Sequence, residues 1–577
     1  MYSPKLNPVN SATNTIDEFL GYNHNLKIAD NEFFDMKNMA GEDYPLLATR
    51  RKRGIVKTLE NPQGLICRGA LCYVDGASLF INNEKVTGLI LSTQPDDCPK
   101  QLVAMGAYIC IFPDKMYVNT VDLSDCGYME DCFCPASGTA VLAPCTSDGG
   151  AITPTSSAVA PANPSNGDYW LDTSGKTHVL KVWYSSISGW LSVPTSYVKF
   201  TCSGVGEHFA IDDCVSFKNT GLSDIDGMHL IIDKGTDYLI IQGTLEQQQT
   251  ISAGFTVERR VPKMDFVVEC NNRLWGCYCG PSDSGVLNEL YCCKLGDFKN
   301  WRYYTGTALD AYSVSLGSDG YFTGAVSYQN TPVFFKENQI HHVYGKTPSS
   351  FTLTSFQCSG VQQGSAKSVQ VIGSEVLYKG TDGFYVYNGA LPSLCSAALG
   401  KKLYYKAVSG VVGDLYYTSL ADEKGDYTLL AYNFRNGLWH KEDELQVLDF
   451  CRVGNELYAV DQNKNLLALR GSAGTDEKDF PWMIETAPIG YMQPNRQSVK
   501  KLFVRLWLQK GTYADVKLQF DFGPWEQIGT VNGADTVQNI ELPMVPRRCD
   551  RFKLKISGNG PCKIYAMTFK IEKGSET

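Results

Sequence analysis

Residues 264–471 repeat one pattern of apolar and polar positions. A short apolar run meets a turn of Gly, Asp or Asn, an aromatic-rich run follows, and a second turn ends the unit. Residues 453–460 with 466–469 make one such unit, and residues 371–378 with 384–387 make another. Because β-branched and aromatic residues alternate between tight turns, the pattern predicts short antiparallel strands.

The units recur about every 40 residues, which is the spacing of propeller blades. Sheets stacked radially in a closed circle bury their faces and leave only short edges exposed. Similar units at 65–81 and 102–118 predict that blades before and after an insertion close one ring of six or seven. A β-sandwich built from such hairpins is the alternative, but the regular recurrence of the unit favours the propeller.

Changes in the pattern predict the domain boundaries. We expect an N-terminal arm at 1–60, the first blades at 61–123, an insertion at 124–262, the remaining blades at 263–472 and a C-terminal β-sandwich at 473–577. The fold class is therefore all-β: a β-propeller interrupted by an inserted β-rich domain and followed by a sandwich.

The insertion and the two ends have their own patterns. Residues 136–166 are dominated by Ser, Thr, Ala, Pro and Gly, which is typical of a flexible connector. A tryptophan-rich hairpin module follows, and the strand-like stretch 197–261 predicts a small β-barrel. In the arm, residues 29–39 read as a short helix. From 484 onward apolar and polar residues alternate with period two, which predicts a sandwich with one buried and one solvated face.

Composition limits the class of protein. With 43% hydrophobic and 20% charged residues, the chain is an ordinary globular protein. Its formal net charge of −9 argues against a nucleic-acid binder held by a basic face. The N-terminal residues lack the apolar segment of a signal peptide, and no apolar run approaches the roughly 18 residues that span a membrane. We therefore interpret the 20 cysteines as mostly buried small side chains of a protein folded in a reducing cytosol.

Sequence motifs for chemistry are scarce. The chain has no C-x-x-C pair for structural zinc, no H-E-x-x-H and no G-x-S-x-G. His341 and His342 are adjacent, so in a strand their side chains face opposite sides and cannot hold one metal ion together. Asp212 with Asp213, and Asp224 with Asp226, are candidate acid–base carboxylates, although loop carboxylates usually cap turns. We expect no catalytic residue, no metal site, no cofactor and no enzymatic activity.

Three tryptophans are candidate contacts for a glycan or a partner protein. Trp170, Trp183 and Trp190 lie within the hairpin module. An aromatic ring is complementary to the apolar face of a pyranose, so these side chains can stack on sugars. The alternative is that they form the small core of a module that has no other.

Four consecutive cations, Arg50, Arg51, Lys52 and Arg53, are candidate contacts for DNA or for a neighbouring subunit in a ring. Positive side chains bind phosphates and acidic surfaces. The alternative is that the run is solvated or paired with carboxylates of the same chain.

The N-terminal segment resembles a known family. The phrase Glu32-x-x-Asp35-Met36-x-Asn38-Met39, then Tyr44-Pro45-x-Leu47, then an arginine-rich stretch that ends in Gly54, resembles the start of tail proteins of tailed bacteriophages. The module sequence Gly167-Asp168-x-Trp170-x-Asp172-Thr173 resembles hairpin modules of phage structural proteins, some of which are similar to chitin-binding modules. Residues 569–576 also resemble the C-termini of these tail proteins.

This resemblance is to the tail nozzle or tail hub proteins of short-tailed phages, also known as packaged-DNA stabilisation proteins. It implies a structural virion protein: a subunit of a homo-oligomeric, hexameric ring in the tail, assembled in the host cytoplasm. Such a ring retains packaged DNA, forms the conduit for its ejection, lies below a portal or adaptor ring and docks fibres or a plug. Double-stranded DNA passes through it transiently. An acidic lumen suits this passage, because phosphate contacts would slow it.

Two other functions stay open from the sequence. The tryptophan module is compatible with a receptor-binding or glycan-binding tail adhesin. A propeller hydrolase would require a cluster of carboxylates at the central mouth of the ring, and the sequence does not place one.

Overall fold

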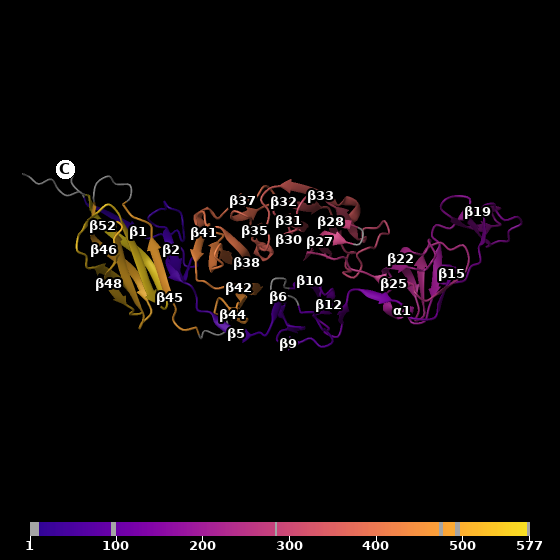
Figure 1. Ribbon diagram of the computed structural model, residues 1–577, viewed down its shortest axis with the longest axis horizontal. Helices are drawn as coiled ribbons and strands as arrows, with labels where there is room; N and C mark the ends of the chain where they lie inside the picture. Colours follow the sequence, from indigo (N-terminus) through magenta and orange to yellow (C-terminus); the bar gives the residue numbers. More distant parts are fainter. Residues whose placement is uncertain (1–10, 94–99, 283–284, 472–476, 491–496, 574–577) are drawn as a thin grey trace, which may run out of the picture.

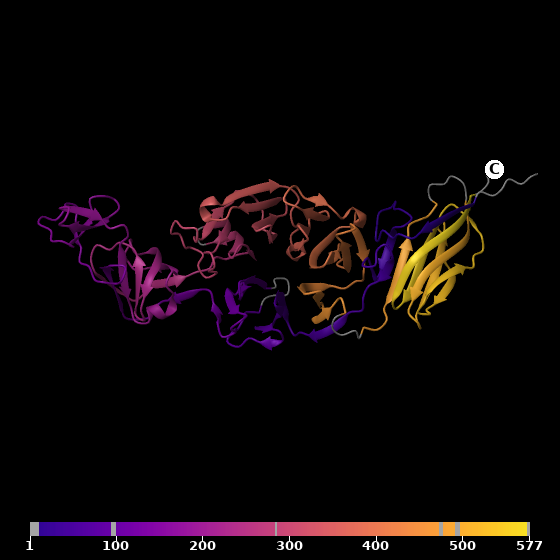
Figure 2. The same cartoon turned by 180° about the vertical axis from the view of Figure 1, so that it is seen from behind.

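The computed structural model describes residues 11–93, 100–282, 285–471, 477–490 and 497–573. Its strands form three regions in a line (Figure 1): a sandwich at one end, a ring of sheets in the middle and the insertion at the other end. The view from behind in Figure 2 shows the same order. The predicted all-β fold, with an interrupted propeller and a C-terminal sandwich, is confirmed.

Seven four-stranded antiparallel sheets form the blades of the ring in the described residues. In chain order, their strands are β6 (Pro62–Arg68), β7 (Ala70–Asp75), β8 (Ser78–Ile81) and β9 (Glu84–Lys85); β10 (Gln101–Met105), β11 (Tyr108–Phe112), β12 (Met116–Asn119) and β13 (Cys126–Tyr128); β26 (Phe266–Glu269), β27 (Leu274–Ser282), β28 (Gly285–Cys292) and β29 (Tyr312–Ser315); β30 (Gly324–Tyr328), β31 (Thr331–Lys336), β32 (Gln339–Tyr344) and β33 (Thr352–Gln357); β34 (Gln370–Ile372), β35 (Glu375–Lys379), β36 (Phe384–Tyr387) and β37 (Ser393–Leu394); β38 (Tyr404–Val412), β39 (Leu415–Asp422), β40 (Tyr427–Asn433) and β41 (Leu438–Lys441); and β42 (Val447–Val453), β43 (Glu456–Asp461) and β44 (Asn465–Ala468) with β5 (Gly54–Thr58).

The ring closes through a strand from the beginning of the chain. β5 pairs antiparallel with β44, with Gly54 opposite Ala468 and Ile55 opposite Leu467. The last blade therefore takes three strands from one end of the propeller sequence and its fourth from the other. This pairing fixes the first blade next to the last and leaves no broad open edge between them.

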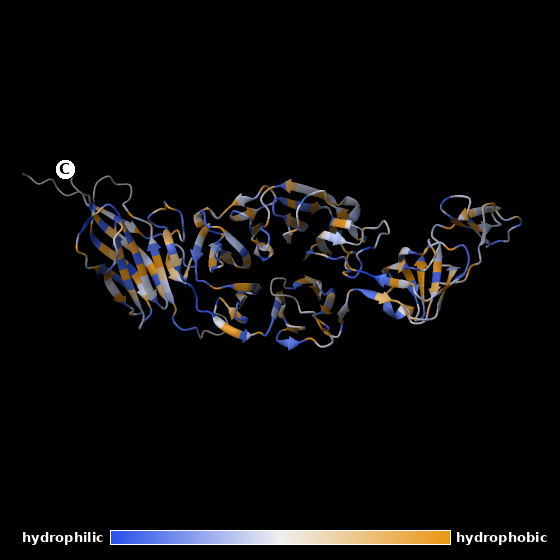
Figure 3. Ribbon diagram, in the orientation of Figure 1, coloured by the Kyte–Doolittle hydropathy of each residue, from blue (hydrophilic) through white to orange (hydrophobic). Residues whose placement is uncertain are grey.

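The C-terminal sandwich is built from both ends of the chain. One sheet contains β3 (Met39–Ala40), β4 (Leu47–Thr49), β52 (Cys562–Lys573), β46 (Gln497–Leu508) and β49 (Val537–Leu542), with β1 (Ser11–Ile16) on β52 and β50 (Arg548–Cys549) on β46. The other contains β2 (Phe33–Lys37), β45 (Pro481–Thr486), β51 (Phe552–Asn559), β47 (Tyr513–Phe520) and β48 (Trp525–Asn532). Figure 3 shows the predicted alternation of hydrophobic and hydrophilic residues along these strands.

The expectation of a separate N-terminal arm at 1–60 is corrected by this topology, and residues 1–10 lie outside the described residues. Strands β1 to β4 belong to the sandwich, and β5 belongs to the ring. The predicted helix at 29–39 is instead β2 and β3, since Met36 pairs with Ile484 of β45. Phe33, Met36 and Met39 are fully buried. Burial against the C-terminal strands outweighs the local helix-like spacing.

The inserted domain contains one eight-stranded sheet and the tryptophan module. The sheet order is β14 (Asp131–Phe133), β25 (Thr256–Arg259), β21 (Cys214–Lys218), β22 (Gly227–Lys234), β23 (Tyr238–Gln242), β20 (Tyr197–Thr201), β15 (Thr139–Cys145) and β24 (Gln249–Ser252), and the module contains β16 (Thr155–Ser157), β17 (Tyr169–Asp172), β18 (Val179–Tyr184) and β19 (Gly189–Ser192). The sheet surrounds one core that includes Phe200, Phe217 and Phe255.

Part of the predicted flexible connector at 136–166 is ordered. β15 pairs with β20 and β24, and its Ala140 and Leu142 side chains are fully buried in the core of the inserted sheet. The Ser- and Thr-rich composition concealed two apolar positions that alternate as in any strand. Helical turns are short in the described part of the chain: α1 (Val205–His208), η1 (Pro348–Ser350), η2 (Ala366–Ser368) and η3 (Ala397–Leu399).

One core cluster joins the sandwich to the propeller. Sandwich residues such as Phe33 and Trp482 belong to the same buried cluster as Phe384 and Trp439 of the fifth and sixth blades. The amide of Tyr22 also donates to the carbonyl oxygen of Trp439 at 2.6 Å. The sandwich and the propeller therefore share a hydrophobic core and are packed against each other.

Gly21 lies at this contact and gives a test of it. Its φ is +77°, and a Cβ atom there would lie 2.4 Å from the carbonyl oxygen of Trp439. Gly69 has a φ of +71°, but a Cβ there would meet nothing within 4 Å. We expect Gly69→Ala to cost about 1–2 kcal/mol for left-handed backbone alone, and Gly21→Ala to cost about 1–3 kcal/mol more for overpacking. Denaturant unfolding of both variants measures the difference, and equal losses would contradict the tight contact.

Candidate functional site

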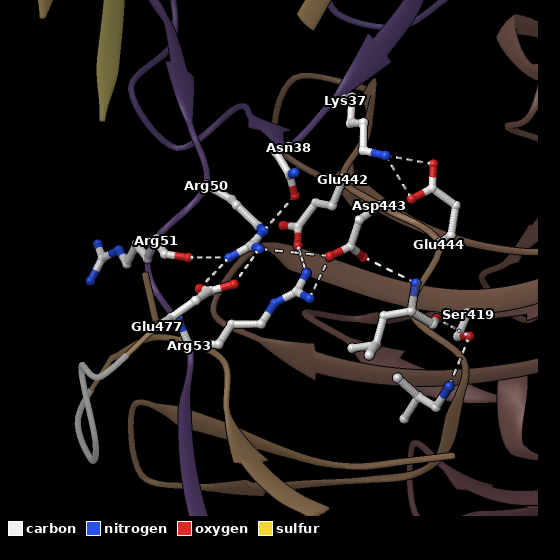
Figure 4. A network of polar contacts seen from close by, with 12 residues as sticks. Lys37, Asn38, Arg50, Arg51, Arg53, Ser419, Glu442, Asp443, Glu444 and Glu477 are labelled. Atoms are coloured by element: carbon white, nitrogen blue, oxygen red, sulfur yellow. Dashed lines mark hydrogen bonds and ion pairs between the residues drawn. The ribbon is translucent and has the colours of Figure 1, made fainter. Parts of the chain in front are cut away.

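The four predicted cations lie between the sandwich and the propeller. β4 ends at Thr49 in the sandwich, and β5 starts at Gly54 in the last blade. The run 50–53 therefore has to cross from one region to the other. The acidic run 442–444 follows β41 on the outside of the sixth blade, and Glu477 lies at the entry to the sandwich. The topology brings these three segments together (Figure 4).

Arg50, Arg53, Glu442, Asp443 and Glu477 form an ionic network that we call the arginine clamp. The Arg53 guanidinium donates to Glu442 and to Asp443, each at 2.6 Å. Arg50 binds Glu477 through two hydrogen bonds of 2.7 and 2.8 Å. The backbone amide of Arg53 donates to Glu477 at 2.7 Å. Bidentate arginine–carboxylate pairs hold their geometry more firmly than single contacts.

Two further contacts orient Arg50. Its Nε atom donates to the side-chain oxygen of Asn38 at 2.7 Å, and its guanidinium lies 4.0 Å from the centre of the Phe480 ring. The Asn38 side-chain amide donates in turn to the carbonyl oxygen of Pro481 at 2.7 Å. The clamp is thus held from the first sandwich strands as well as from the C-terminal ones.

The charges of the clamp stabilise each other. Burial disfavours a charged Arg53, but Asp443 and Glu442 raise its pKa overall. Burial likewise raises the pKa of Asp443, and the nearby Arg53 and Arg50 lower it by more. For Glu477, burial raises the pKa and the hydrogen bonds from Arg50 and Arg53 lower it, with a net downward shift. Arg53, Asp443 and Glu477 therefore stay charged near neutral pH, whereas for Glu442 burial outweighs Arg53 and Arg50 and raises the pKa of the carboxyl.

The prediction that the cationic run contacts DNA or a ring neighbour is corrected for two residues. Arg50 and Arg53 are 7% exposed, and their guanidinium groups donate hydrogen bonds to carboxylates of the same chain. They have no open face for a phosphate. Arg51 pairs with Glu42 at 2.7 Å and Lys52 with Asp479 at 2.8 Å, both at the surface. For Arg51 and Lys52 a contact with DNA or a neighbouring subunit stays a prediction.

The sequence did not identify the partners of the cations. Glu442 and Asp443 lie about 390 residues from Arg53 in the chain. One signal was available: the acidic run Glu442-Asp443-Glu444 is the only place near a predicted blade end where three carboxylates follow each other in the sequence. An acidic run and a cationic run in one chain favour each other as partners, but the sequence did not say that they meet.

A second buried ionic joint ties the insertion to the propeller. Arg259 of β25 forms an ion pair with Asp213, and its Nε atom donates to the carbonyl oxygen of Met129 at 3.1 Å. The side-chain amide of Asn300, in the third blade, donates to Asp213 at 2.9 Å. Asp213 is thus buried and fully engaged, so this candidate acid–base carboxylate serves as a structural connection. Asp212 contributes its carbonyl oxygen to Lys294 at 3.3 Å.

The three tryptophans share one face of the tryptophan module. Trp183 of β18 is directly opposite Trp190 of β19, and Trp170 of β17 is opposite Lys181 of β18. Directly paired residues point to the same side of a sheet. Trp170 and Trp183 each contact Trp190 edge to face, with ring centres 5.4 Å apart.

The tryptophans differ in how accessible they are. Trp170 is buried, its indole N–H donates to Ser157 at 2.9 Å, and Lys181 lies over its ring at 4.6 Å. Trp183 and Trp190 are partly exposed. Trp170 therefore acts as the core of the module, whereas Trp183 and Trp190 keep ring surface for a ligand. Trp170 thus fits the interpretation as a module core, and Trp183 and Trp190 fit the interpretation as ligand contacts.

The inner strands of the blades carry few carboxylates. In the described strands β6, β10, β26, β30, β34, β38 and β42, these are Glu269 and Asp449. Glu269 accepts the amide of Asn272 at 2.8 Å, and Asp449 pairs with Lys367 at 2.9 Å. Among the described residues, no group of three or more His, Cys, Asp or Glu side chains is placed to hold a metal ion. No helix in the described part of the chain is long and apolar enough to cross a bilayer.

Comparison with protein families and with curated proteins found no match. Solved structures with some likeness include an exo-β-1,3-galactanase from Phanerochaete chrysosporium with galactose, 11% identical, with 52% of this chain and 94% of that chain covered and a TM-score of 0.21. A family 43 arabinoxylan arabinofuranohydrolase from Bacillus subtilis is 11% identical, covers 69% and 93%, and has a TM-score of 0.17. The phage phi92 endosialidase is 11% identical, covers 83% and 56%, and has a TM-score of 0.14.

These solved structures are glycoside hydrolases, and they contradict the expectation that the chain has no enzymatic activity, which we withdraw. At these TM-scores the likeness assigns neither an activity nor a substrate to this chain.

Proposed function

We propose that this chain is a structural subunit of the tail of a tailed bacteriophage, a nozzle or hub protein. In this proposal several copies, six by the resemblance, form a closed ring in the virion tail after assembly in the host cytoplasm. The ring retains packaged DNA, forms the conduit for its ejection, sits below a portal or adaptor ring and docks fibres or a plug.

The observation that carries the proposal is the rigid connection of three domains in one line. The arginine clamp and the shared core hold the sandwich to the propeller. Asn300 of the third blade, which hydrogen-bonds to Asp213 and to the amide of Cys214, holds the insertion to the propeller. Buried ion pairs with hydrogen-bond partners favour one arrangement of their elements. A subunit that must keep its ends in register with neighbours above and below needs such joints. The N-terminal resemblance, at Asp35-Met36, supports the same function.

The oligomeric state tests the proposal. The purified full-length protein is expected to form a closed ring of one defined mass in light scattering, and a ring with an open central channel in electron micrographs. The same protein is expected in the tail of the purified particle. A protein that stays monomeric at all concentrations, and that is absent from the particle, would overturn the proposal.

A second candidate function is a glycan-binding tail adhesin, favoured by the exposed surfaces of Trp183 and Trp190. If they stack on sugars, Trp183→Ala is expected to weaken binding on a glycan array about fivefold or more, on the scale of base–aromatic stacking, which is worth about 1–3 kcal/mol per base. Tyr184→Ala is the matched control, since Tyr184 is exposed on the opposite face of the same strand. Equal binding by wild type and the Trp183 variant would exclude this site.

Hydrolysis is tested separately. Turnover of any member of a polysaccharide panel by the purified protein would make the ring an enzyme. Substitution of Asp449→Asn and Glu269→Gln, the inner-strand carboxylates, would then show whether the ring is the place of the chemistry.

A further inference from the structure

The outer face of the seven-stranded sandwich sheet carries a row of three side chains that the preceding functions do not use. Phe503, Arg505 and Trp507 alternate along β46 with the buried residues Val504 and Leu506. They therefore point away from the core, and we call them the aromatic–arginine row. At about 3.4 Å per residue, the first and last positions lie about 14 Å apart along the strand.

The neighbours of the row are short side chains at its centre. Arg505 pairs with Asn539 of β49 on one side and with Ala566 of β52 on the other. Arg505 is exposed, and Phe503 and Trp507 are partly exposed. Phe503 lies opposite Glu541 of β49, and Trp507 lies opposite Val537 of β49 and Lys563 of β52, so longer or charged side chains flank the two ends of the row.

The rings of the row differ from those on the opposite face of the sandwich. There, Lys553 lies 5.2 Å from the Phe34 ring centre and Lys555 lies 4.5 Å from that of Trp525. Glu485 holds both lysines, at 3.2 and 2.7 Å. Phe503 and Trp507, by contrast, have no cation or ring partner among the described residues. One face of the sandwich covers its aromatic rings, and the other leaves them open.

The face also carries uncompensated positive charge. Lys501 pairs with Glu541 at 2.7 Å, and Lys563 pairs with Asp43 at 2.8 Å. Arg505 and Lys570 have no ion-pair partner among the described residues. The charge left over is positive, which favours an anionic partner.

We propose that this face binds an acidic oligosaccharide. Phe503 and Trp507 stack on the apolar faces of two sugar rings, and Arg505 forms a bidentate pair with the carboxylate of a sugar between them. A planar guanidinium suits a carboxylate because its N–H groups match the two oxygens. The flat sheet surface suits an extended ligand that lies along the strand.

A nucleic acid fits this face less well. Binding of a duplex requires several cations that neutralise successive phosphates. Here Lys500, Lys501 and Lys563 already pair with Glu572, Glu541 and Asp43, so Arg505 and Lys570 alone are left among the described residues, too few to neutralise successive phosphates. Single-stranded DNA, which stacks bases on aromatic side chains, is therefore kept as an outcome of the test.

The test measures binding of three acidic probes to the full-length protein by titration calorimetry: oligogalacturonate, a hyaluronan oligosaccharide and oligosialic acid. Cellohexaose serves as the neutral probe and oligothymidylate as the nucleic acid. We expect saturable binding of at least one acidic sugar, with the neutral sugar and the oligothymidylate at least tenfold weaker. Arg505→Ala and Trp507→Ala are each expected to weaken acidic-sugar binding at least tenfold, and Arg505→Lys to weaken it less.

Two controls separate this site from the others. Lys517→Ala, on the opposite outer face of the sandwich, and Trp183→Ala, in the tryptophan module, are expected to keep binding within twofold of wild type. Arg505→Ala, Arg505→Lys and Lys517→Ala are expected to keep the wild-type melting temperature, because neither of these side chains is in the core. The proposal is overturned if no acidic sugar binds saturably, if oligothymidylate binds more tightly, or if Trp183→Ala loses binding while Trp507→Ala keeps it. None of these outcomes bears on whether the protein forms a ring.

Discussion

Arg53→Ala is expected to lower the free energy of unfolding by about 3–5 kcal/mol, the usual loss when one partner of a buried ion pair is removed. The variant leaves Glu442 and Asp443 buried beside each other with only Arg50 nearby, at 3.7 Å from Asp443. Two carboxylates without their main cation must either repel each other or take up a proton, and both lower stability. Loss of the Arg53 side chain also removes one of the links between the run 50–53 and the sixth blade.

The effect is measured by calorimetric unfolding of the full-length protein at pH 7. Because the sandwich and the propeller share one core cluster, we expect one of two forms: a lower transition temperature, or a split into two transitions as the regions separate. Arg51→Ala is the matched control. It removes an arginine two residues away that is 54% exposed and paired with Glu42 at the surface, where a pair is worth about 0–1 kcal/mol. Equal effects of the two variants would show that the arginine clamp does not hold the regions together.

A double variant separates the charge effect from loss of contact. Arg53→Met with Glu442→Met removes the cation together with the carboxylate that is almost fully buried. Replacement of a buried pair by apolar side chains of similar volume is often neutral or stabilising. We expect the double variant to recover part of the stability that Arg53→Ala loses, with the rest set by Asp443.

The blades were predictable because their information is local. In residues 453–460, 466–469 and their counterparts, alternating apolar residues and tight turns specify hairpins whose strands are neighbours in sequence. The strand that closes the ring was not predictable in the same way. β5 lies among residues that the sequence assigned to an arm, and its partner β44 begins at Asn465. No local pattern states that a strand will pair across 400 residues.

The same limit explains the errors at the ends of the chain. Phe33, Met36 and Met39 have spacings that suit a helix, yet each is fully buried in the sandwich. Pairing with β45 decides the outcome, and β45 is contributed by the other end of the chain. Ala140 and Leu142 were hidden in a stretch whose Ser, Thr and Pro content indicated a connector. Composition averages over residues, whereas a strand needs only every second position to be apolar.

The candidate sites show a similar division. The sequence identified Arg50 and Arg53 by their charge. It did not identify their partners Glu477, Glu442 and Asp443, which belong to distant parts of the chain. It identified Trp170 and Trp183 by type, but their different burial depends on the register between β17, β18 and β19. Register follows from pairing and turn geometry, so side-chain roles within a module need the structure.

Mild acid is expected to destabilise the protein through its buried histidines. Three histidines are buried: His341, His342 and His440. The pKa of each is lowered to about 4, by burial in all three and, for His341, also by the charge of nearby Lys336. His341 lies between the hydroxyls of Ser318 and Ser355, at 3.2 and 2.7 Å. These hydroxyls serve the neutral imidazole and give a proton no counter-charge.

The direction of this pH effect follows from the histidine pKa values in the unfolded and the folded protein. An unfolded histidine binds a proton below a pKa of about 6.5, whereas the folded ones stay neutral until about pH 4. The stabilisation is therefore complete above pH 6.5 and is lost as the pH falls toward 4, by about 3 kcal/mol for each histidine. Asp443 and Glu477 have lowered pKa values, so their contribution is lost only at lower pH, below about 4.5.

Urea unfolding midpoints at pH 7.5, 6.5, 5.5 and 4.5 measure this loss. We expect a steady fall below pH 6.5 in the wild type and a shallower slope in His341→Gln, because the variant has one fewer group that takes up a proton on unfolding. A midpoint that stays constant from pH 7.5 to 5.5 would mean that the buried histidines take up protons without unfolding. In that case the interior of the fourth and sixth blades would have to open to water without loss of the ring.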